Sequence, residues 1–447
     1  MRKIMNKLFV LLFALMLVSA LLLSCDNSAE TTDSTNDSST TDSSTTDSST
    51  TNSSTTDSST TDSGEADDKS TVVIDKIIYT LSGEEYHVAG VEEGYGENLV
   101  ILEECEGLPV TKILYKAFYQ LENLKSLTIP KTIVEIEEYL GISSCTNLSR
   151  LTVAEENASY KSIDGNLYTE DGKTLLLYAA GKADESFAVS ESVDTIYSYA
   201  FKDAVNLKNV DFTNVKNIGG NAFEGCVNLE AVDFSNVKII DGLAFLNCDS
   251  LETVTISSSV CEIGNGAFAD CSSLKEILVD ERNVFYKSVD GILFSKIEGY
   301  ILYQYPAGKE DTEIIFDGFE GTEIAPDSFR GANNIVSIVV DEMSTMRTIG
   351  ARAFMGCRGL KSFFISEDAM ISDINVASFL DCESLETVVI NEAVSRMGYN
   401  VFMGCDKLTI FLQLSESQIE YYVKFNNWAA NWNVDGCPVQ YDYVYEN

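Results

Sequence analysis

The chain has 447 residues, of which 45% are hydrophobic, and its 70 acidic against 30 basic side chains give a formal net charge of −40. Such an acidic chain is a poor partner for nucleic acid, which proteins bind through clustered Lys and Arg. Its single histidine, His87, excludes a multi-histidine metal site, and any triad with a histidine base would have to use it. We therefore expect neither an enzyme nor a cofactor or metal.

Residues 1–24 have the features of a bacterial lipoprotein signal peptide. A positive head at residues 2–7 precedes the apolar run Leu8–Leu23, whose 16 residues are marginal for a membrane span but normal for a signal-peptide core. The run ends in Leu-Leu-Ser before Cys25 and resembles a lipobox, which implies cleavage before Cys25 and lipid attachment to it. The alternative is an uncleaved transmembrane anchor. In both cases the rest of the chain leaves the cytoplasm.

Residues 25–70 are predicted to be a lipidated Cys followed by a disordered tether. After Cys25 the composition is almost only Ser, Thr, Asp and Asn, and the unit Thr-Asp-Ser-Ser-Thr recurs. No aromatic residue and no aliphatic residue larger than Ala is present to offset the entropy of ordering. Eleven acidic residues and one Lys favour an extended stalk that holds the following domain away from the membrane. The composition leaves O-glycosylation open.

Residues 113–414 contain about ten copies of one repeat. Four consecutive copies begin at Ile196, Ile218, Ile240 and Ile263, with spacings of 22, 22 and 23 residues. Leu-x-x-Val-x-Ile in each copy predicts a short strand, and Ala-Phe-x-x-Cys predicts a short helical turn on the opposite side of the coil. One coil cannot bury its own apolar face, so neighbouring coils must stack around a continuous core. The other copies begin at Ile113, Ile136 (a degraded copy), Ile324, Ile349, Ile374 and Met397.

Two positions of the repeat are predicted to be structural. One Phe of each copy should form a buried spine without a functional role, made of Phe118, Phe201, Phe223, Phe245, Phe268, Phe329, Phe354, Phe379 and Phe402. A repeated Cys should be a buried free thiol that behaves as a small hydrophobe, because stacked side chains point the same way rather than at each other. These are Cys226, Cys248, Cys271, Cys357, Cys382 and Cys405. Cys105, Cys261 and Cys437 lie outside this register, and the sequence leaves their disulfide state open.

Two related inserts interrupt the array, near residues 157–190 and 283–320. Tyr160–Gly165 and Tyr286–Gly291 match at an offset of 126 residues, and each ends in Asp-Gly. Asp-Gly between alternating apolar residues is a strong hairpin signal. We predict two β-hairpins that stand off the array.

The repeat Ile-Gly-x-x-Ala-Phe-x-x-Cys-x-x-Leu, at Ile263–Leu274, resembles the BspA-like, Treponema-type leucine-rich repeat. The resemblance covers about residues 77–447. It implies a leucine-rich repeat solenoid, a β-rich curved array with short helical turns, two hairpin inserts and terminal caps. It also implies a surface protein that binds macromolecules without catalysis. The family pattern favours a Pro after the strand, which here only Pro130 retains.

Both ends of the array need caps, because the end coils would otherwise expose core. We assign residues 71–112 to an N-terminal cap and residues 415–447 to a C-terminal cap. Ser417 and Glu420 have the spacing of a capping box, which predicts a helix that runs on toward Trp428 and closes the last coil. Cap packing, with sugar stacking as the alternative, is the interpretation for Trp428, Trp432, Tyr441, Tyr443 and Tyr445.

The outward residue between Val and Ile of each strand is the candidate working surface, on a face that we expect to be concave. It is polar in the first copies and apolar in the later ones, at Leu278, Val339, Phe364 and Val389, with Leu412 if the last copy keeps register. An apolar stripe on an exposed face indicates a partner site. The alternatives are plain β-propensity or cover by the second insert.

Together these features predict a lipid-anchored protein of the bacterial cell envelope, exposed at the surface. Its expected partners are host or neighbouring-cell proteins or glycans, and the membrane through the lipid on Cys25. The alternative is a structural envelope lipoprotein that scaffolds other surface components.

Overall fold

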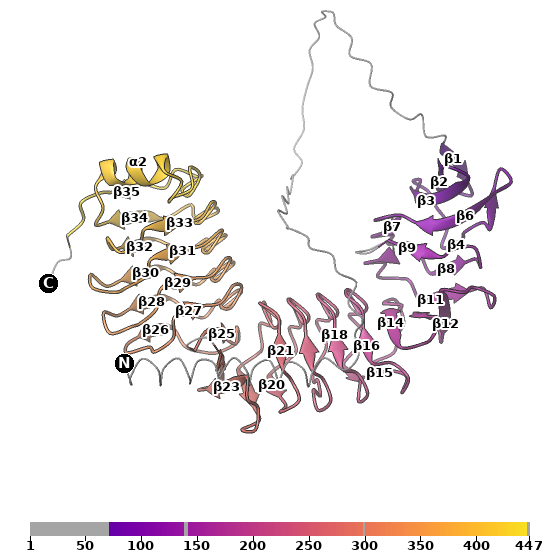
Figure 1. Ribbon diagram of the computed structural model, residues 1–447, viewed down its shortest axis with the longest axis horizontal. Coiled ribbons are helices and arrows are strands. Elements are labelled where there is room, and N and C mark those ends of the chain that lie inside the picture. The colour runs from indigo at the N-terminus through magenta and orange to yellow at the C-terminus, as the bar shows by residue number, and fades with distance from the viewer. Residues whose placement is uncertain (1–70, 138–141, 298–299, 445–447) are drawn as a thin grey trace, which may run out of the picture. The chain divides into compact units, whose positions relative to one another are not determined.

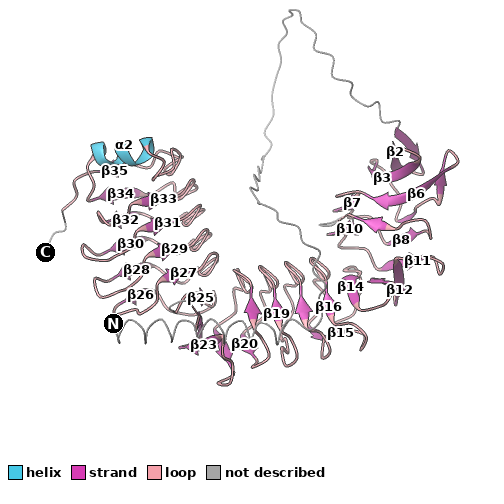
Figure 2. Cartoon of the chain, in the orientation of Figure 1, coloured by secondary structure: helices cyan, strands magenta, loops and turns pink. Residues whose placement is uncertain are grey.

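The computed structural model describes residues 71–137, 142–297 and 300–444 (Figure 1). The predicted signal peptide, Cys25 and the predicted tether lie outside the described residues. The described part is a stack of coils built almost entirely of strands, and helix α2 (Glu416–Lys424) is its one helix (Figure 2). Among the described residues, no helix has both the length and the apolar content to cross a bilayer.

The Leu-x-x-Val-x-Ile segments form the long strands of the coils, as the repeat predicts. In the described residues these strands form four separate parallel ladders, within which each strand pairs with the equivalent strand of a neighbouring coil. Buried inward residues alternate with outward residues along each strand. The array has about 13 turns. The long strands are β4 (Asn98–Val100), β8 (Ser126–Ile129), β11 (Arg150–Val153), β15 (Ser186–Ala188), β17 (Asn209–Asp211), β20 (Thr253–Ile256), β22 (Glu276–Val279), β26 (Glu313–Phe316), β28 (Ser337–Val340), β30 (Ser362–Ile365), β32 (Thr387–Ile390), β34 (Thr409–Leu412) and β35 (Val439–Gln440).

Short strands around the first Ile of each copy form a second set of parallel ladders on another side of the coils. These strands are β9 (Glu135–Ile136), β16 (Thr195–Ile196), β18 (Asn217–Ile218), β19 (Ile239–Ile240), β21 (Glu262–Ile263), β27 (Glu323–Ile324), β29 (Thr348–Ile349), β31 (Asp373–Ile374) and β33 (Arg396–Met397). Between the short and long strands, the Ala-Phe-x-x-Cys segment forms tight turns, in which the N–H of Cys226 donates to the carbonyl of Phe223 at 3.1 Å.

The predicted Phe spine is confirmed. Phe223 and Phe245 stack with ring centroids 4.9 Å apart, and Phe245 and Phe268 with centroids 5.5 Å apart. The spine has members that the repeat pattern missed. Tyr178 of the first insert stacks on Phe201 at 5.1 Å, and Tyr305 of the second stacks on Phe329 at 4.7 Å.

In the degraded copy, Ile142 takes the place of the spine Phe. It lies in β10 (Ile142–Ser143), opposite Phe118 of β7 (Phe118–Tyr119). An aliphatic residue thus replaces an aromatic one at one level of the stack.

The repeated cysteines are buried free thiols, as predicted. Each thiol donates to the carbonyl of the spine Phe in the preceding coil, as from Cys226 Sγ to Phe201 O at 3.1 Å. This position therefore favours Cys, because the thiol is small and carries a weak S–H donor for the buried carbonyl of the preceding coil. Burial raises the pKa of the Cys271 and Cys357 thiols to about 12. Of the three cysteines outside the register, Cys105 and Cys437 are buried and Cys261 is partly exposed.

Both inserts contain the predicted hairpins, with Asp164 and Gly165 at the first turn in the left-handed conformation that this dipeptide favours. The hairpins do not stand off the array. In each insert the second hairpin strand pairs with a third strand, which joins the short-strand ladder of the next coil. The strands are β12 (Tyr160–Ile163), β13 (Asn166–Thr169), β14 (Thr174–Leu177), β23 (Tyr286–Val289), β24 (Ile292–Ser295) and β25 (Leu302–Gln304).

The N-terminal cap is a small sheet that begins antiparallel and turns parallel where it meets the array. In it, His87 Nε2 lies 2.9 Å from Glu85 Oε1, so the single histidine is hydrogen-bonded within the cap. The cap strands are β1 (Thr71–Ile74), β2 (Ile77–Ser82), β3 (Glu85–Val91), β5 (Glu104–Cys105) and β6 (Leu108–Ile113).

The C-terminal cap differs from the prediction in two ways. The capping box is Ser415 with Gln418, not Ser417 with Glu420. The helix ends at Lys424, because the chain turns at Asn426 with a positive φ, so Trp428 lies beyond it. Trp428 extends the short-strand ladder by pairing with Met397.

The C-terminal tryptophans close the core. Trp428 is fully buried and Trp432 nearly so, and their rings meet edge to face at 5.1 Å. Cap packing is therefore confirmed for both, and neither offers a face on which a sugar could stack. Tyr443 packs on Phe411 with centroids 5.1 Å apart, and Tyr445 lies outside the described residues.

Candidate functional site

The first candidate surface is the outward face of the sheet from β26 to β34. The outward residues Ile315, Val339, Phe364, Val389 and Phe411 lie in register on neighbouring strands. We call these five residues the apolar stripe. With strands about 4.8 Å apart, the stripe is roughly 19 Å long.

Two of the predicted stripe residues do not offer surface. Leu412 is fully buried and lies in register with Ile390 on the inner face, so the prediction for Leu412 is wrong. The last copy has one residue fewer between Leu408 and its strand, which moves Phe411 into the outward position. Val389 points outward but is only 1% exposed, between the larger Phe364 and Phe411.

One stripe residue was missed and one lies apart. Ile315, 55% exposed, belongs to the second insert, where no Leu-x-x-Val-x-Ile pattern marks its strand. Leu278 is exposed as predicted, but it lies on the separate two-stranded sheet of β20 and β22. The continuous stripe therefore begins after the second hairpin.

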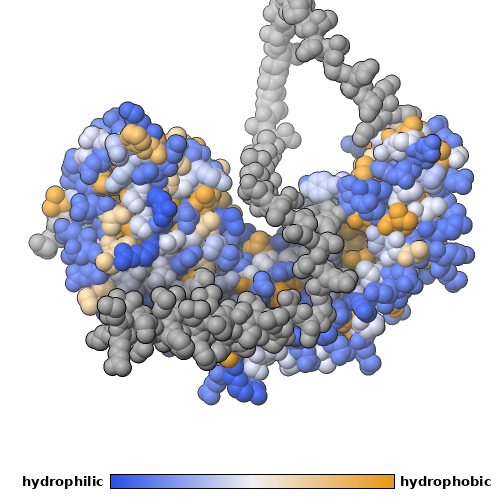
Figure 3. All heavy atoms as spheres, in the orientation of Figure 1, coloured by the Kyte–Doolittle hydropathy of each residue, from blue (hydrophilic) through white to orange (hydrophobic). Residues whose placement is uncertain are grey.

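Polar side chains flank the apolar stripe on both sides. At least one exposed acidic residue follows each of its strands in the sequence: Asp317, Glu342, Glu367 with Asp368, Glu392 and Glu416. A hydroxyl row lies on the other side in the same register: Ser337, Ser362, Thr387 and Thr409. On the face shown in Figure 3, hydrophobic residues likewise lie in small groups among hydrophilic ones. The surface is thus suited to a partner that is apolar in its centre and basic at its edge.

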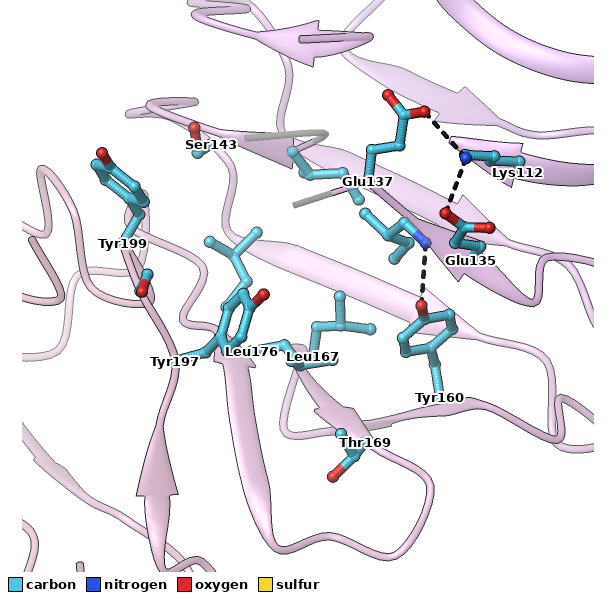
Figure 4. A pocket seen from close by; sticks show the side chains of 14 residues that line it. Lys112, Glu135, Glu137, Ser143, Tyr160, Leu167, Thr169, Leu176, Tyr197 and Tyr199 are labelled. Carbon is cyan, nitrogen blue, oxygen red and sulfur yellow. Dashed lines mark hydrogen bonds and ion pairs between the residues drawn. The ribbon is translucent and has the colours of Figure 1, made fainter. Parts of the chain in front are cut away.

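The second candidate is a pocket of about 460 Å³ where the first insert meets the coil before it (Figure 4). Its floor is aliphatic and its rim is polar and aromatic. The floor consists of Ile136, Ile142, Leu167, Leu176 and Leu177. The rim includes Lys112, Glu135, Glu137, Tyr160, Tyr197 and Tyr199.

The charged part of the rim is an ion-pair cluster. Lys112 Nζ lies 2.8 Å from Glu135 Oε1 and 3.0 Å from Glu137 Oε1, and these carboxylates raise the pKa of Lys112. The N–H of Tyr115 donates to the other oxygen of Glu137 at 2.6 Å, and this bond, with Lys112, lowers the pKa of Glu137. The side chain of Glu135 is 57% exposed, so its carboxylate faces solvent beside the pocket.

Two hydroxyl groups define the inner wall of the pocket. The Tyr160 hydroxyl accepts the backbone N–H of Ile136 at 3.0 Å, and burial, followed by the charge of Glu135, raises the pKa of Tyr160. Ser143 is buried, and its Oγ has no hydrogen-bond partner in the structure.

Neither histidine nor cysteine lines the pocket, so it lacks the usual nucleophile and base pairs. Among residues 71–137, 142–297 and 300–444, no group of three His, Cys, Asp or Glu residues could hold a metal ion. The sequence did not predict this pocket, although its one signal, the degraded copy at Ile136, was visible.

Three solved structures are among those to which this chain is similar. A crystallised leucine-rich cell surface protein from Faecalibacterium prausnitzii is 21% identical, with 80% of this chain and 98% of that chain covered and a TM-score of 0.45. The pneumococcal vaccine antigen PcpA is 18% identical, with 84% and 99% covered and a TM-score of 0.36. The Treponema pallidum leucine-rich repeat protein TpLRR is 20% identical, with 64% and 88% covered and a TM-score of 0.21.

A search of curated proteins found no match. The family model described as the BspA type leucine rich repeat region matches residues 103–172, 180–290 and 312–428, in six copies. These segments make up more than half of the chain and coincide with the stacked coils, so the protein belongs to the BspA-type leucine-rich repeat family.

Proposed function

We propose that this is a lipid-anchored surface protein that captures a macromolecular partner on the apolar stripe and carries out no catalysis. The observation that carries the proposal is the alignment of apolar outward residues on consecutive strands of the sheet from β26 to β34. A sheet face that contacts only water usually carries polar outward residues. The first half of this array does so at Thr128, Asp211 and Thr255. Proteins with this repeat are usually non-catalytic binding proteins.

A protein partner suits the stripe better than a glycan. Aliphatic residues form most of the stripe, whereas sugars stack on flat aromatic faces, and Phe364 and Phe411 are the only aromatic members. The acidic row after the strands favours basic residues around the partner's apolar contact, which raises the association rate and aids specificity.

A charge placed in the stripe tests this proposal. We expect Phe364→Glu to weaken capture of surface partners at least tenfold, because it puts a buried charge into an apolar contact. The matched control is Val100→Glu, which changes an exposed outward residue of β4 at the far end of the array. Normal partner binding by Phe364→Glu, with the fold intact by circular dichroism, would show that the stripe is not the site.

Protease treatment of intact cells tests display at the surface. Residues 26–68 contain no Lys or Arg, so the first accessible tryptic sites are at Lys69 and Lys76. Release of a stable body from intact cells supports display. Cleavage only after lysis would favour the alternative, a structural lipoprotein that scaffolds other components inside the envelope.

A further inference from the structure

The two inserts provide an internal comparison, because they build the same structure twice. In each, a hairpin Tyr accepts the backbone N–H of a short-strand Ile: Tyr160 from Ile136 at 3.0 Å, and Tyr286 from Ile263 at 2.9 Å. In each, a Leu of the third strand pairs with the short strand of the next coil, Leu175 with Ile196 and Leu302 with Ile324. The residues that follow, Leu176 and Tyr303, are therefore structurally equivalent.

The second insert fills its space with an aromatic ring. Tyr303 packs edge to face on Tyr286 with centroids 5.7 Å apart, and its hydroxyl donates to the carbonyl of Ile263. At the first insert Leu176 has neither the ring nor the hydroxyl. At the first insert, too, Ile142 stands in the spine where Phe268 stands in the equivalent coil. The pocket at the first insert thus results from two smaller residues at defined positions of a duplicated structure.

The rim of the pocket also differs between the two copies. Lys112 and Glu137 stand where the second copy has Ile239 and Gly264, so the charged cluster occurs only at the first insert. Lys112 binds two carboxylates at once, which leaves an excess of one negative charge at the rim. Both oxygens of Glu137 are used by Lys112 and Tyr115, whereas Glu135 faces solvent.

We propose that this pocket binds a small amphipathic amine, with an apolar ring or branched chain on the aliphatic floor and the ammonium group against Glu135. The volume of about 460 Å³ falls within the usual range of small-molecule sites, which is on the order of 300–1,000 Å³. The floor has no charge, so only an apolar group is accommodated there without a desolvation penalty. The tyrosine rim favours a cation further.

The test is a titration of the whole purified protein with phenethylamine, in which binding is measured by calorimetry or NMR. The probe is compared with 2-phenylethanol, which lacks the charge, and with 3-phenylpropionate, which reverses it. We expect saturable one-to-one binding of the amine, at least tenfold weaker binding of the alcohol, and no binding of the acid. Equal affinity for the acid and the amine, or no saturable binding of the amine, would overturn the proposal.

Two variants locate the site. Leu176→Tyr installs the residue of the second insert, and we expect it to reduce amine binding at least tenfold without lowering the melting temperature. Glu135→Gln should bring the affinity of the amine to within about twofold of that of the alcohol. Glu262→Gln, at the equivalent position beside the second insert, is the matched control and should change neither the affinity for the amine nor that for the alcohol.

The variants also separate this proposal from the function proposed for the stripe. Phe364→Glu should leave amine binding unchanged, because the stripe and the pocket share no residue. If Leu176→Tyr fails to fold, the comparison of Glu135→Gln with Glu262→Gln decides. Unchanged amine preference in Glu135→Gln would refute the proposed contact.

Discussion

Replacing Phe245 by Ala should open a hole in the centre of the spine. The side chain is fully buried and lies between Phe223 and Phe268, with ring centroids at 4.9 and 5.5 Å, while Phe234 meets it edge to face at 5.5 Å. Truncating a buried Phe to Ala costs about 3–5 kcal/mol. Aromatic pairs add about 0.5–1.5 kcal/mol each beyond burial, so we expect a loss near the upper end, about 5 kcal/mol.

The cavity should persist because the neighbouring coils cannot move into it. The short-strand ladder and the hydrogen bonds from the N–H of Phe223 to Ala244 O and from the N–H of Phe245 to Ala267 O hold these coils at a fixed distance. An array loses both interfaces when one coil is disrupted. The assay is urea unfolding followed by far-ultraviolet circular dichroism, with hydrogen exchange of the Phe223–Phe268 coils to locate the loss. Both tryptophans lie in the C-terminal cap, so their fluorescence reports that end separately.

The control is Phe425→Ala, which removes an exposed ring at the end of α2 and should cost less than about 1 kcal/mol. The reasoning fails if Phe245→Ala costs less than about 2 kcal/mol, or if the two variants are equally destabilised. Either result would mean that the neighbouring coils close the cavity or that the buried ring contributes little to stability.

Three further results are expected. Asp327, which is 1% exposed, accepts two hydrogen bonds from Arg352 at 2.8 and 3.0 Å, so Asp327→Ala should destabilise the fold by about 3 kcal/mol. Removing the exposed ion pair of Arg358 and Glu383 should cost under about 1 kcal/mol, and an equally small loss of stability in Asp327→Ala would contradict the prediction. The pKa of Glu137 is lower in the folded than in the unfolded chain, so its stabilisation is present above about pH 4.3 and is lost as the pH falls through the folded pKa. The midpoint of unfolding should therefore decline less between about pH 5 and 3 in Glu137→Gln than in the unsubstituted protein. Midpoints that decline equally in both proteins would contradict this prediction. In the native protein at pH 8, a thiol reagent should modify Cys261 and spare the spine-linked thiols until unfolding, whereas rapid modification of all thiols would show that the array opens locally.

The repeat pattern was sufficient to predict the coils, because it depends on contacts that recur every 22 or 23 residues. The alternation in Leu-x-x-Val-x-Ile predicts which residues are buried, and the recurring Phe and Cys predict one ring and one thiol at each level of the core. Each of these residues packs against the equivalent residue of the next coil, as Phe223 does against Phe245. Local pattern and tertiary contact carry the same information in a stack of equal coils.

The working surfaces could be predicted only in part, because Val339, Phe364 and Val389 follow the repeat whereas the rest lies where the period breaks. Ile315, Phe411 and Tyr178 occupy repeat positions, but each is reached through an insertion or a shortened link that shifts the count along the chain. The pocket depends on contacts between residues far apart in sequence, such as the 40 residues that separate Tyr303 from Ile263 in the filled copy. Side-chain size at such positions has meaning only once the returning strand has found its partner, so the vacancy beside Leu176 becomes visible only in the folded chain.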